Sequence, residues 1–340
     1  MSNTYRRYLL GLFSYVVCIG CTIVDVDNRQ EFTSGDIFVL DIAHNNLDRF
    51  TQKNALLQFP VWSPDGRKIV YRADNALNIA DINTGKSEVL VNLGFARFAS
   101  FSFDWSPDGE TIAYLTDDDN GNQVVSVIDV ESKQIAKSIL TGGNFFYSAL
   151  DWSPRGDFIL LYSGNNDARL IEFETDEVII IEDVGGALSV AWCPNGEAFA
   201  FSTLTRQSFG EFDTGLYNVD TNSRVTLSEF GAIQMKWSDD GSTLAFVTRG
   251  RSSSTLYTLQ VGEEAKEIIN SRGLVRLLGW TNDDSELIFI DPESNRLSSI
   301  NTTSGRIERL SRRDFNDSEW VQLSPDKMHI VFGFQRFFNR

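Results

Sequence analysis

The chain has 340 residues and a formal net charge of -17, with 42% hydrophobic and 12% aromatic residues. This composition supplies a packed core and argues against disorder. A charge this acidic disfavours nucleic acid as a partner, because nucleic-acid binding requires clustered Lys and Arg.

The first twenty residues differ from the remainder. Arg6 and Arg7 precede an apolar run from Tyr8 to Gly20, which is too short to span a bilayer but suits an export signal. The run ends in Cys18-Ile19-Gly20-Cys21, which resembles a bacterial lipobox, although Leu is usual where Cys18 stands. We therefore expect residues 1–20 to be a lipoprotein signal, Cys21 to carry lipid and residues 21–35 to form a tether. An ordinary secretory signal and a short membrane anchor remain alternatives.

From residue 36 onward the chain is organised by a repeated phrase of Trp, Ser, Pro, Asp and Gly. It is intact at Trp62–Gly66 and Trp105–Gly109 and degenerate in five later copies, which begin at Trp152, Trp192, Trp237, Trp280 and Leu323. Successive copies are 43, 47, 40, 45, 43 and 43 residues apart. A period of this length is typical of the blades of a β-propeller.

Each copy is followed by an apolar, β-rich run such as Ile112-Ala113-Tyr114, and then by a second hairpin with a polar turn. Two hairpins supply the four strands of one blade. Residues 35–51 form a second half-repeat without a first, whereas residues 320–334 form a first half without a second. We therefore predict an all-β fold over residues 36–340: a seven-bladed propeller of four-stranded blades, whose last blade is closed by both chain termini.

The phrase and the strand after it, as in Trp105 to Tyr114, resemble the TolB-type propeller repeat, also called the WD40-like repeat. The resemblance covers roughly residues 36–334. It implies a periplasmic or secreted bacterial binding scaffold. TolB itself has an amino-terminal α/β domain for which this chain has no room, and this difference leaves a role in envelope constriction in doubt.

Catalytic patterns are sparse. His44 and His329 are the two histidines, and we interpret both as structural or solvated, which leaves no zinc constellation. No Gly-x-Ser-x-Gly elbow occurs, which disfavours a serine hydrolase. Residues 117–122 fit a calcium loop poorly, so we expect a solvated hairpin tip. We interpret Cys193 as a buried replacement for Ser. No cofactor and no metal are expected.

Candidate binding residues lie where the repeats differ. Polar residues stand just before the repeat tryptophans on the predicted innermost strands, where they either line the channel or satisfy neighbouring backbone: Asp104, Asp151, Lys236 and Gln322. A second candidate is the longest loop inside a repeat, residues 206–213, with side chains favoured at interfaces: Arg206, Phe209 and Phe212. Aromatic residues at 145–147 and the ending 336–340 are further possibilities.

These observations predict a non-enzymatic, lipid-anchored, monomeric scaffold for a protein or peptide partner in the bacterial envelope. Thr22 follows the lipobox cysteine in place of the Asp associated with inner-membrane retention, so we expect the outer membrane, facing the periplasm. The alternative is a propeller that binds or cleaves carbohydrate through the carboxylates of Asp104 and Asp151.

Overall fold

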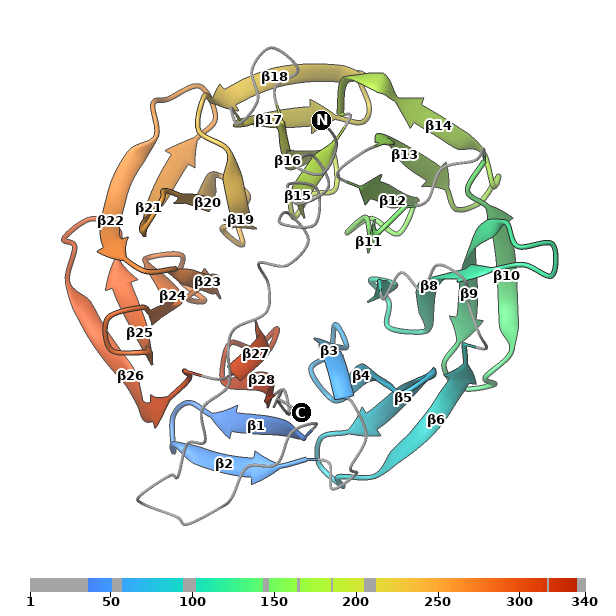
Figure 1. Cartoon of the computed structure of the whole chain (residues 1–340), viewed down its shortest axis with the longest axis horizontal. Helices are drawn as coiled ribbons and strands as arrows, with labels where there is room; N and C mark the ends of the chain where they lie inside the picture. The colour runs from blue at the N-terminus through green and yellow to red at the C-terminus, as the bar shows by residue number, and fades with distance from the viewer. Residues whose placement is uncertain are drawn as a thin grey trace, which may run out of the picture.

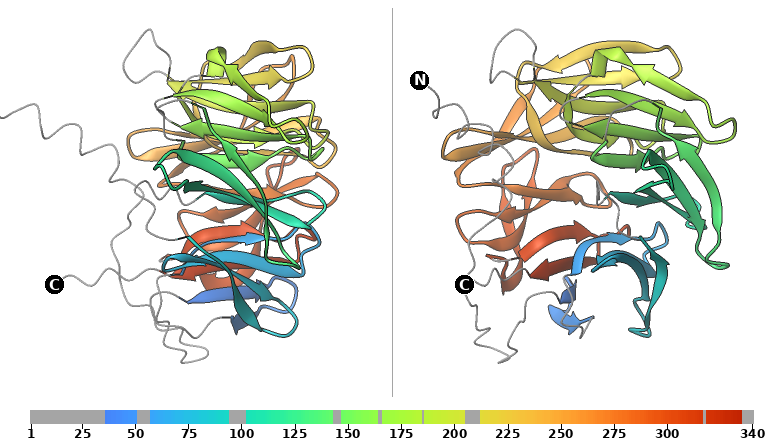
Figure 2. Two further views of the ribbon diagram at one scale, coloured as in Figure 1. Left: turned by 90° about the vertical axis from the view of Figure 1, so that its right-hand side faces the viewer. Right: turned by 45° about the vertical axis from the view of Figure 1, so that its right-hand side comes forward.

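The computed structural model describes residues 36–50, 57–93, 102–142, 147–163, 166–184, 186–204, 212–316 and 318–334. Seven four-stranded antiparallel sheets are arranged in a ring around a central axis, as Figure 1 shows. The side views in Figure 2 show the twisted sheets packed against their neighbours around the ring. The predicted seven-bladed propeller is therefore confirmed.

The blades are numbered here in chain order, and in blades 1 to 6 the first strand is the innermost. Blade 1 contains β3 (Leu57–Trp62), β4 (Lys68–Ala73), β5 (Ala76–Asp81) and β6 (Ser87–Asn92). Blade 2 contains β7 (Phe103–Trp105), β8 (Thr111–Asp117), β9 (Gln123–Asp129) and β10 (Ile135–Leu140). Blade 3 contains β11 (Ala149–Trp152), β12 (Phe158–Ser163), β13 (Asn166–Glu172) and β14 (Val178–Ile181), followed by the 3₁₀ turn η1 (Glu182–Val184).

Blades 4 to 6 repeat this order. Blade 4 contains β15 (Ala187–Trp192), β16 (Ala198–Leu204), β17 (Phe212–Asn218) and β18 (Ser223–Ser228). Blade 5 contains β19 (Ala232–Trp237), β20 (Thr243–Arg249), β21 (Ser253–Gln260) and β22 (Lys266–Arg272). Blade 6 contains β23 (Arg276–Trp280), β24 (Glu286–Asp291), β25 (Arg296–Asn301) and β26 (Ile307–Asp314).

Blade 7 is built from both ends of the propeller. Its inner strands are β27 (Ser318–Leu323) and β28 (His329–Phe334), and its outer strands are β1 (Ile37–Asp41) and β2 (Asn46–Arg49). β1 pairs antiparallel with β28, so that Ile37 lies opposite Gly333 and Asp41 opposite His329. The closure expected from the two half-repeats is therefore confirmed.

The hydrophobic core is divided among the junctions between blades. In the described part of the chain, seven apolar clusters form, one between each pair of neighbouring sheets. Trp105 and Ile112 of blade 2, for example, pack against Val70 and Leu77 of blade 1. The repeat tryptophans therefore serve the core, as their alternation with the polar positions predicts.

The repeated phrase forms a tight turn at one end of each inner hairpin. In blade 2, Ser106 Oγ donates to Asp108 Oδ1 at 2.5 Å and accepts the backbone N–H of Thr111 at 3.0 Å. Gly109 has a φ of +74°, which favours glycine. It also lies against Pro64 of the preceding turn, 3.7 Å from where a Cβ would stand. Similar contacts recur at other junctions, so the turns support one another around the ring.

The remaining polar motifs lie in turns or at a strand end, where the sequence placed them. His44 lies in the turn between β1 and β2, where its Nδ1 is 2.7 Å from Asp41 Oδ2. His329 begins β28 beside the ring of Trp62. Asp118 accepts the backbone N–H groups of Asn120 and Asn122 at the tip between β8 and β9, as in an ordinary turn.

Candidate functional site in the central channel

Three of the polar residues singled out in the sequence meet in the channel. Asp104, Asp151 and Lys236 lie on β7, β11 and β19, each directly before a tryptophan that is buried in the core. Because side chains alternate along a strand, these three point away from the core and toward the channel. Ala191 occupies the same position in blade 4, between Asp151 and Lys236, and its small side chain leaves space there.

That space is a cavity of about 320 Å³. Its polar lining comes from Asp104, Asp151 and Lys236, and its apolar lining includes Met235 and three tryptophans: Trp152, Trp192 and Trp237. A volume of this size lies at the small end of the range for ligand pockets. The cavity thus combines charged groups of both signs with a few apolar residues.

Asp104 also connects two blades. Its Oδ1 accepts the backbone N–H of Trp105 at 2.9 Å, and its Oδ2 accepts the backbone N–H of Trp152 in blade 3 at 2.9 Å. The sequence left channel lining and backbone satisfaction as alternatives for this residue. The structure shows that one side chain does both.

Asp151 has a different environment, because it hydrogen-bonds the phenol of Tyr162 on β12. Burial is the main cause that raises the pKa of Asp151 to about 8, and the charge of Asp104 adds to it. Burial also raises the pKa of Asp104, to about 6, although two backbone N–H donors oppose the change. The pKa of Tyr162 is raised well above its ordinary value, first by burial.

Lys236 is the cation of the cluster. Burial lowers its pKa from the ordinary value, and Asp151 and Asp104 partly oppose that change. The side chain of Lys236 remains accessible to solvent in the channel. The raised pKa values of Asp104 and Asp151 favour their protonated forms, and the neighbouring charge of Lys236 opposes this effect.

The indole groups around this cluster depart from the pattern of the ring. At four junctions the indole N–H donates to a backbone carbonyl of the neighbouring blade. This carbonyl belongs to the residue just before that blade's repeat tryptophan or, in blade 7, before Leu323: Trp62 to Gln322, Trp105 to Val61, Trp237 to Ala191 and Trp280 to Lys236. The indole nitrogens of Trp152 and Trp192 are buried and have no hydrogen-bond partner within the described residues. These are the junctions on either side of Asp151.

The other candidates lie apart from this cavity. Gln322 occupies the equivalent position in blade 7, but it does not line the cavity, and its carbonyl accepts the indole N–H of Trp62 at 3.4 Å. Arg206, Phe209, Cys21 and the ending 336–340 lie outside the described residues. Phe212 was expected in a loop, but it begins β17, opposite Leu204 of β16, because the strand pairing extends further than the polar sequence indicated.

Tyr162 and the unpaired indoles of Trp152 and Trp192 were missed by the sequence reasoning. Tyr162 stands ten positions after the repeat tryptophan, where other blades carry Arg72, Leu115 and Val247. A tyrosine among such varied residues gave no usable signal. Tyr147, which the sequence grouped with possible interface aromatics, is 2% exposed and belongs to the core.

The structure gives no support for a metal centre at this site. Among the described residues, no three His, Cys, Asp or Glu side chains gather closely enough to hold a metal ion. In the same part of the chain, no helix is long and apolar enough to cross a membrane.

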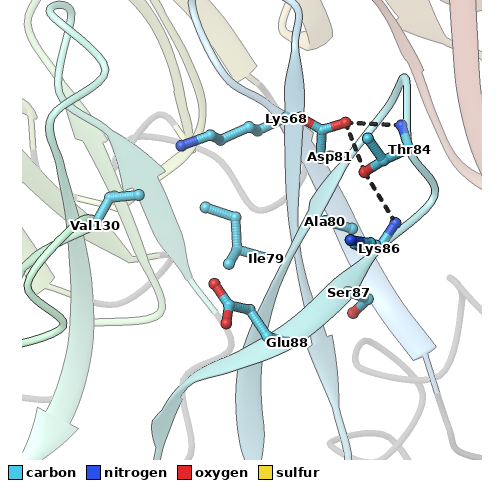
Figure 3. Close-up of a pocket in the computed structure, with 9 residues that line it drawn as sticks. All are labelled: Lys68, Ile79, Ala80, Asp81, Thr84, Lys86, Ser87, Glu88 and Val130. Atoms are coloured by element: carbon cyan, nitrogen blue, oxygen red, sulfur yellow. Dashed lines mark hydrogen bonds between the residues drawn. The ribbon is translucent and has the colours of Figure 1, made fainter.

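A second hollow lies at the periphery between blades 1 and 2 (Figure 3). It has a volume of about 500 Å³ and is lined by Lys68, Asp81, Lys86 and Glu88. Asp81 Oδ1 accepts the backbone N–H and the hydroxyl of Thr84, and Glu88 pairs with Lys133 at 2.6 Å. Because both carboxylates are engaged by the turn or by a neighbouring lysine, this hollow is an ordinary polar cleft between blades.

Residues 23–260 match the family model described as the dipeptidyl peptidase IV (DPP IV) N-terminal region. A curated relative, the "Putative Tricorn-like protease N-terminal subunit" of Sulfurisphaera tokodaii, is 26% identical over 121 residues, which cover 33% of this chain and 60% of that protein. The chain thus spans less than two thirds of that relative.

Solved structures share the fold at low identity. TolB from Acinetobacter baumannii is 18% identical with a TM-score of 0.51, over 70% of this chain and 64% of that one. A putative TolB from Agrobacterium tumefaciens is 17% identical with a TM-score of 0.53, over 89% and 98%. Hydrazine synthase from Kuenenia stuttgartiensis is 16% identical with a TM-score of 0.56, over 74% and 78%. These likenesses concern the propeller fold.

Proposed function

The chain belongs to the family of the dipeptidyl peptidase IV N-terminal region, and from its TolB-type propeller and channel we propose a non-enzymatic scaffold of the bacterial cell envelope. In this proposal the central cavity binds a short segment of a protein partner. The chain acts as a monomer and is held at the outer membrane, facing the periplasm, by lipid on Cys21.

The cavity between Asp151 and Lys236 is the observation that carries the proposal. A peptide segment presents N–H and C=O groups together with apolar side chains. The carboxylates and the ammonium offer partners of both kinds, and the half-buried Ala191 and Trp192 offer apolar contacts. Aromatic residues are enriched in the cores of protein interfaces. The volume accommodates one or two side chains, so we expect a short motif to enter.

A photo-crosslinking experiment tests this binding mode. A photoreactive amino acid replaces Ala191 in the full-length chain, which is expressed in the organism it comes from. A control variant carries the same amino acid in place of Ile135, which is exposed on β10. We expect a specific protein adduct from position 191 that is weakened by Lys236→Met. Adducts that are equal at both positions, or that ignore Lys236→Met, would argue against the cavity as the binding site.

The lipid anchor requires its own test. We expect Cys21→Ser to abolish fatty-acid labelling and to release the chain from the membrane fraction, whereas Cys193→Ser should leave both unchanged. Density fractionation of the membranes then distinguishes the outer from the inner membrane. Unchanged membrane partitioning of Cys21→Ser would contradict the lipoprotein assignment and favour an uncleaved anchor.

Carbohydrate binding or cleavage is the second candidate, favoured by two carboxyl groups of different pKa beside indole rings. Two observations weaken the cleavage reading. Both oxygens of Asp104 already accept backbone N–H groups, and the phenol of Tyr162 engages Asp151. Glycan-array binding or glycan turnover that Asp104→Asn and Asp151→Asn together abolish would favour this function over the scaffold.

The names of the family and of the curated relative raise a link to peptidases. The sequence has no Gly-x-Ser-x-Gly elbow, so we place any peptidase on the partner side of the proposed interaction. A peptidase in the crosslinked adduct from position 191 would identify that kind of partner.

A further inference from the structure

Outside the channel, the outer strand of blade 6 departs from the repeat. Arg296 of the inner partner β25 pairs with Asp314 of β26, and Ser298 pairs with Arg309. Two residues along β25 are therefore matched by five along β26. The corresponding irregularities in blades 1, 2, 4 and 5 contain a single extra residue on the outer strand. Bulges re-aim side chains and are over-represented beside functional sites.

The enlarged bulge is fixed in place by residues at its centre. Leu310 packs against the apolar cluster between blades 6 and 7. Ser311 is 3% exposed, and its Oγ donates to Asn45 Oδ1 at 3.1 Å in the turn between β1 and β2. The same Oγ accepts the backbone N–H of Arg313 at 3.0 Å. The backbone that carries the flanking arginines is therefore held against blade 7.

Arg309 and Arg312 flank this fixed centre and line one groove of about 570 Å³, whose other wall is the turn from Ile42 to Asn45. Both arginines are exposed, and neither guanidinium group makes an ion pair or a hydrogen bond within the described ranges. The nearby acids are engaged elsewhere: Glu308 pairs with Arg306, and Asp41 with His44. In a chain of net charge -17, two unpaired guanidinium groups in one groove are unexpected.

From this arrangement we infer that the groove between blades 6 and 7 binds a phosphate group. A guanidinium presents a planar fork of N–H donors, which matches the oxygens of carboxylates and phosphates. One fork already fills the two oxygens of a carboxylate, whereas a phosphate has oxygens for two forks. The phosphate belongs either to a lipid headgroup or to a small soluble molecule, because both present the same chemistry. This site is independent of the central cavity and of its proposed partner.

Binding is measured on the full chain carrying Cys21→Ser, so that no lipid of its own confuses the result. The probes are inorganic phosphate and glycerol phosphate by calorimetry, and vesicles of phosphatidylglycerol or of phosphatidylcholine by co-sedimentation. We expect Arg309→Gln with Arg312→Gln to weaken binding by about a hundredfold, at about tenfold for each lost charged hydrogen-bonding group. Arg249→Gln with Arg251→Gln, two exposed arginines of blade 5, makes the same change in charge and should leave binding unchanged.

Comparison of binding to the vesicles with binding to the soluble phosphates identifies the source of the phosphate. Binding to phosphatidylglycerol vesicles with weak binding of the soluble phosphates assigns a headgroup, and the reverse assigns a soluble ligand. Arg309→Lys with Arg312→Lys keeps the charge but removes the forks, and we expect it to bind at least several-fold more weakly than the parent chain. No binding of any probe, equal losses in the blade 5 control, or full binding by the lysine variant would each overturn the inference. So would preferential binding of an acidic peptide.

Discussion

Asp104 and Trp152 are joined across the junction between blades 2 and 3, where the aspartate Oδ2 accepts the tryptophan's backbone N–H at 2.9 Å. At the same junction the indole nitrogen of Trp152 is buried without a partner in the described residues, although the indoles at four other junctions donate to a backbone carbonyl. A carboxylate therefore supplies the link between neighbouring inner strands here. The channel cluster is thus part of the ring's structure as well as its candidate binding site.

This link makes a prediction about stability. Asp104→Ala removes the acceptor of two backbone N–H groups, those of Trp105 and Trp152, and we expect the free energy of unfolding to fall by about 3 kcal/mol. Asp104→Asn keeps one acceptor oxygen and should cost about half as much. Urea unfolding measures both. Asp151→Asn is the matched control, because the structure gives Asp151 no backbone donor, and a loss for it equal to that of Asp104→Ala would contradict the linking role.

The channel cluster also predicts how stability depends on pH. In the native state the pKa values of Asp104 and Asp151 are raised to about 6 and about 8, from an ordinary value of 3.8 that the unfolded chain retains. The native state therefore binds more protons than the unfolded state in this interval. The contribution of these two groups to the free energy of unfolding is therefore fully present when the pH lies below their ordinary pKa, and it decreases as the pH rises toward 8.

Other titrating groups act differently. The turn aspartates Asp65, Asp240 and Asp326 have lowered pKa values, so their contribution is lost only as the pH falls below their ordinary value. The lowered pKa of Lys236 acts with the opposite sign to the channel carboxyl groups, because the native state then binds fewer protons than the unfolded chain below the ordinary value of 10.5. Urea unfolding should therefore show that the free energy of unfolding declines between about pH 5 and about pH 8. This decline should be smaller in the double variant Asp104→Asn with Asp151→Asn. An unchanged slope in that double variant would rule out the cluster as its source.

The fold could be predicted from the sequence because the determinants of a blade are local and repeated. The turn residues, the buried strand and the position of the tryptophan recur at one spacing, so each copy supports the interpretation of the others. The closure of blade 7 followed from two half-repeats. Phe212 was misplaced because its strand begins in a polar stretch, where hydrophobic alternation gives no signal.

The candidate site could be predicted only in part. The sequence placed Asp104, Asp151 and Lys236 on the innermost strands and left channel lining and backbone satisfaction open. Spacing could not show that a small residue at Ala191 opens a cavity between two of them. Tyr162 joins the cluster through pairing of β11 with β12, in which Ala149 lies opposite Tyr162. The bulge at Arg309 to Asp314 was likewise invisible, because the strand has an ordinary composition and only its register is irregular.

Cys193 provides a test of the repeat turn itself. In blade 5 the equivalent Ser238 donates to Asp240 Oδ1 at 2.6 Å and accepts the backbone N–H of Thr243 at 2.9 Å. Cys193 is 7% exposed, and its thiol makes only a long contact of 3.9 Å with the carbonyl of Gly241. We expect Cys193→Ser to gain the turn's hydrogen bonds and to raise the free energy of unfolding by up to about 1 kcal/mol.

The reverse change, Ser238→Cys, should lower the free energy of unfolding by about 1 to 3 kcal/mol, because it removes the acceptor of a backbone N–H. Thermal and urea unfolding of the two variants form a matched pair. If both variants are destabilised to the same extent, Cys193 has a packing role in the cluster between blades 4 and 5 that a serine cannot fill.

Closure of the ring depends on β1, whose Phe38 is 1% exposed and stacks on Phe332 of β28, with ring centroids 5.8 Å apart. We expect Phe38→Ala to lower the free energy of unfolding by about 3 to 5 kcal/mol, as is usual for a large-to-small change in a core. Phe289→Ala in blade 6 is the control, because Phe289 is equally buried but lies away from the closure.

The two variants should differ in where the native state opens. β1 pairs with β2 and β28, and Phe38 anchors it in the cluster between blades 6 and 7, so weakening this core contact favours local detachment of the strand. Hydrogen exchange of the β1 amides, such as that of Val39, should accelerate more in Phe38→Ala than in Phe289→Ala, when both are compared at equal global stability. Equal protection of β1 in the two variants would mean that the propeller opens as one unit and that blade 7 is no weaker than the others.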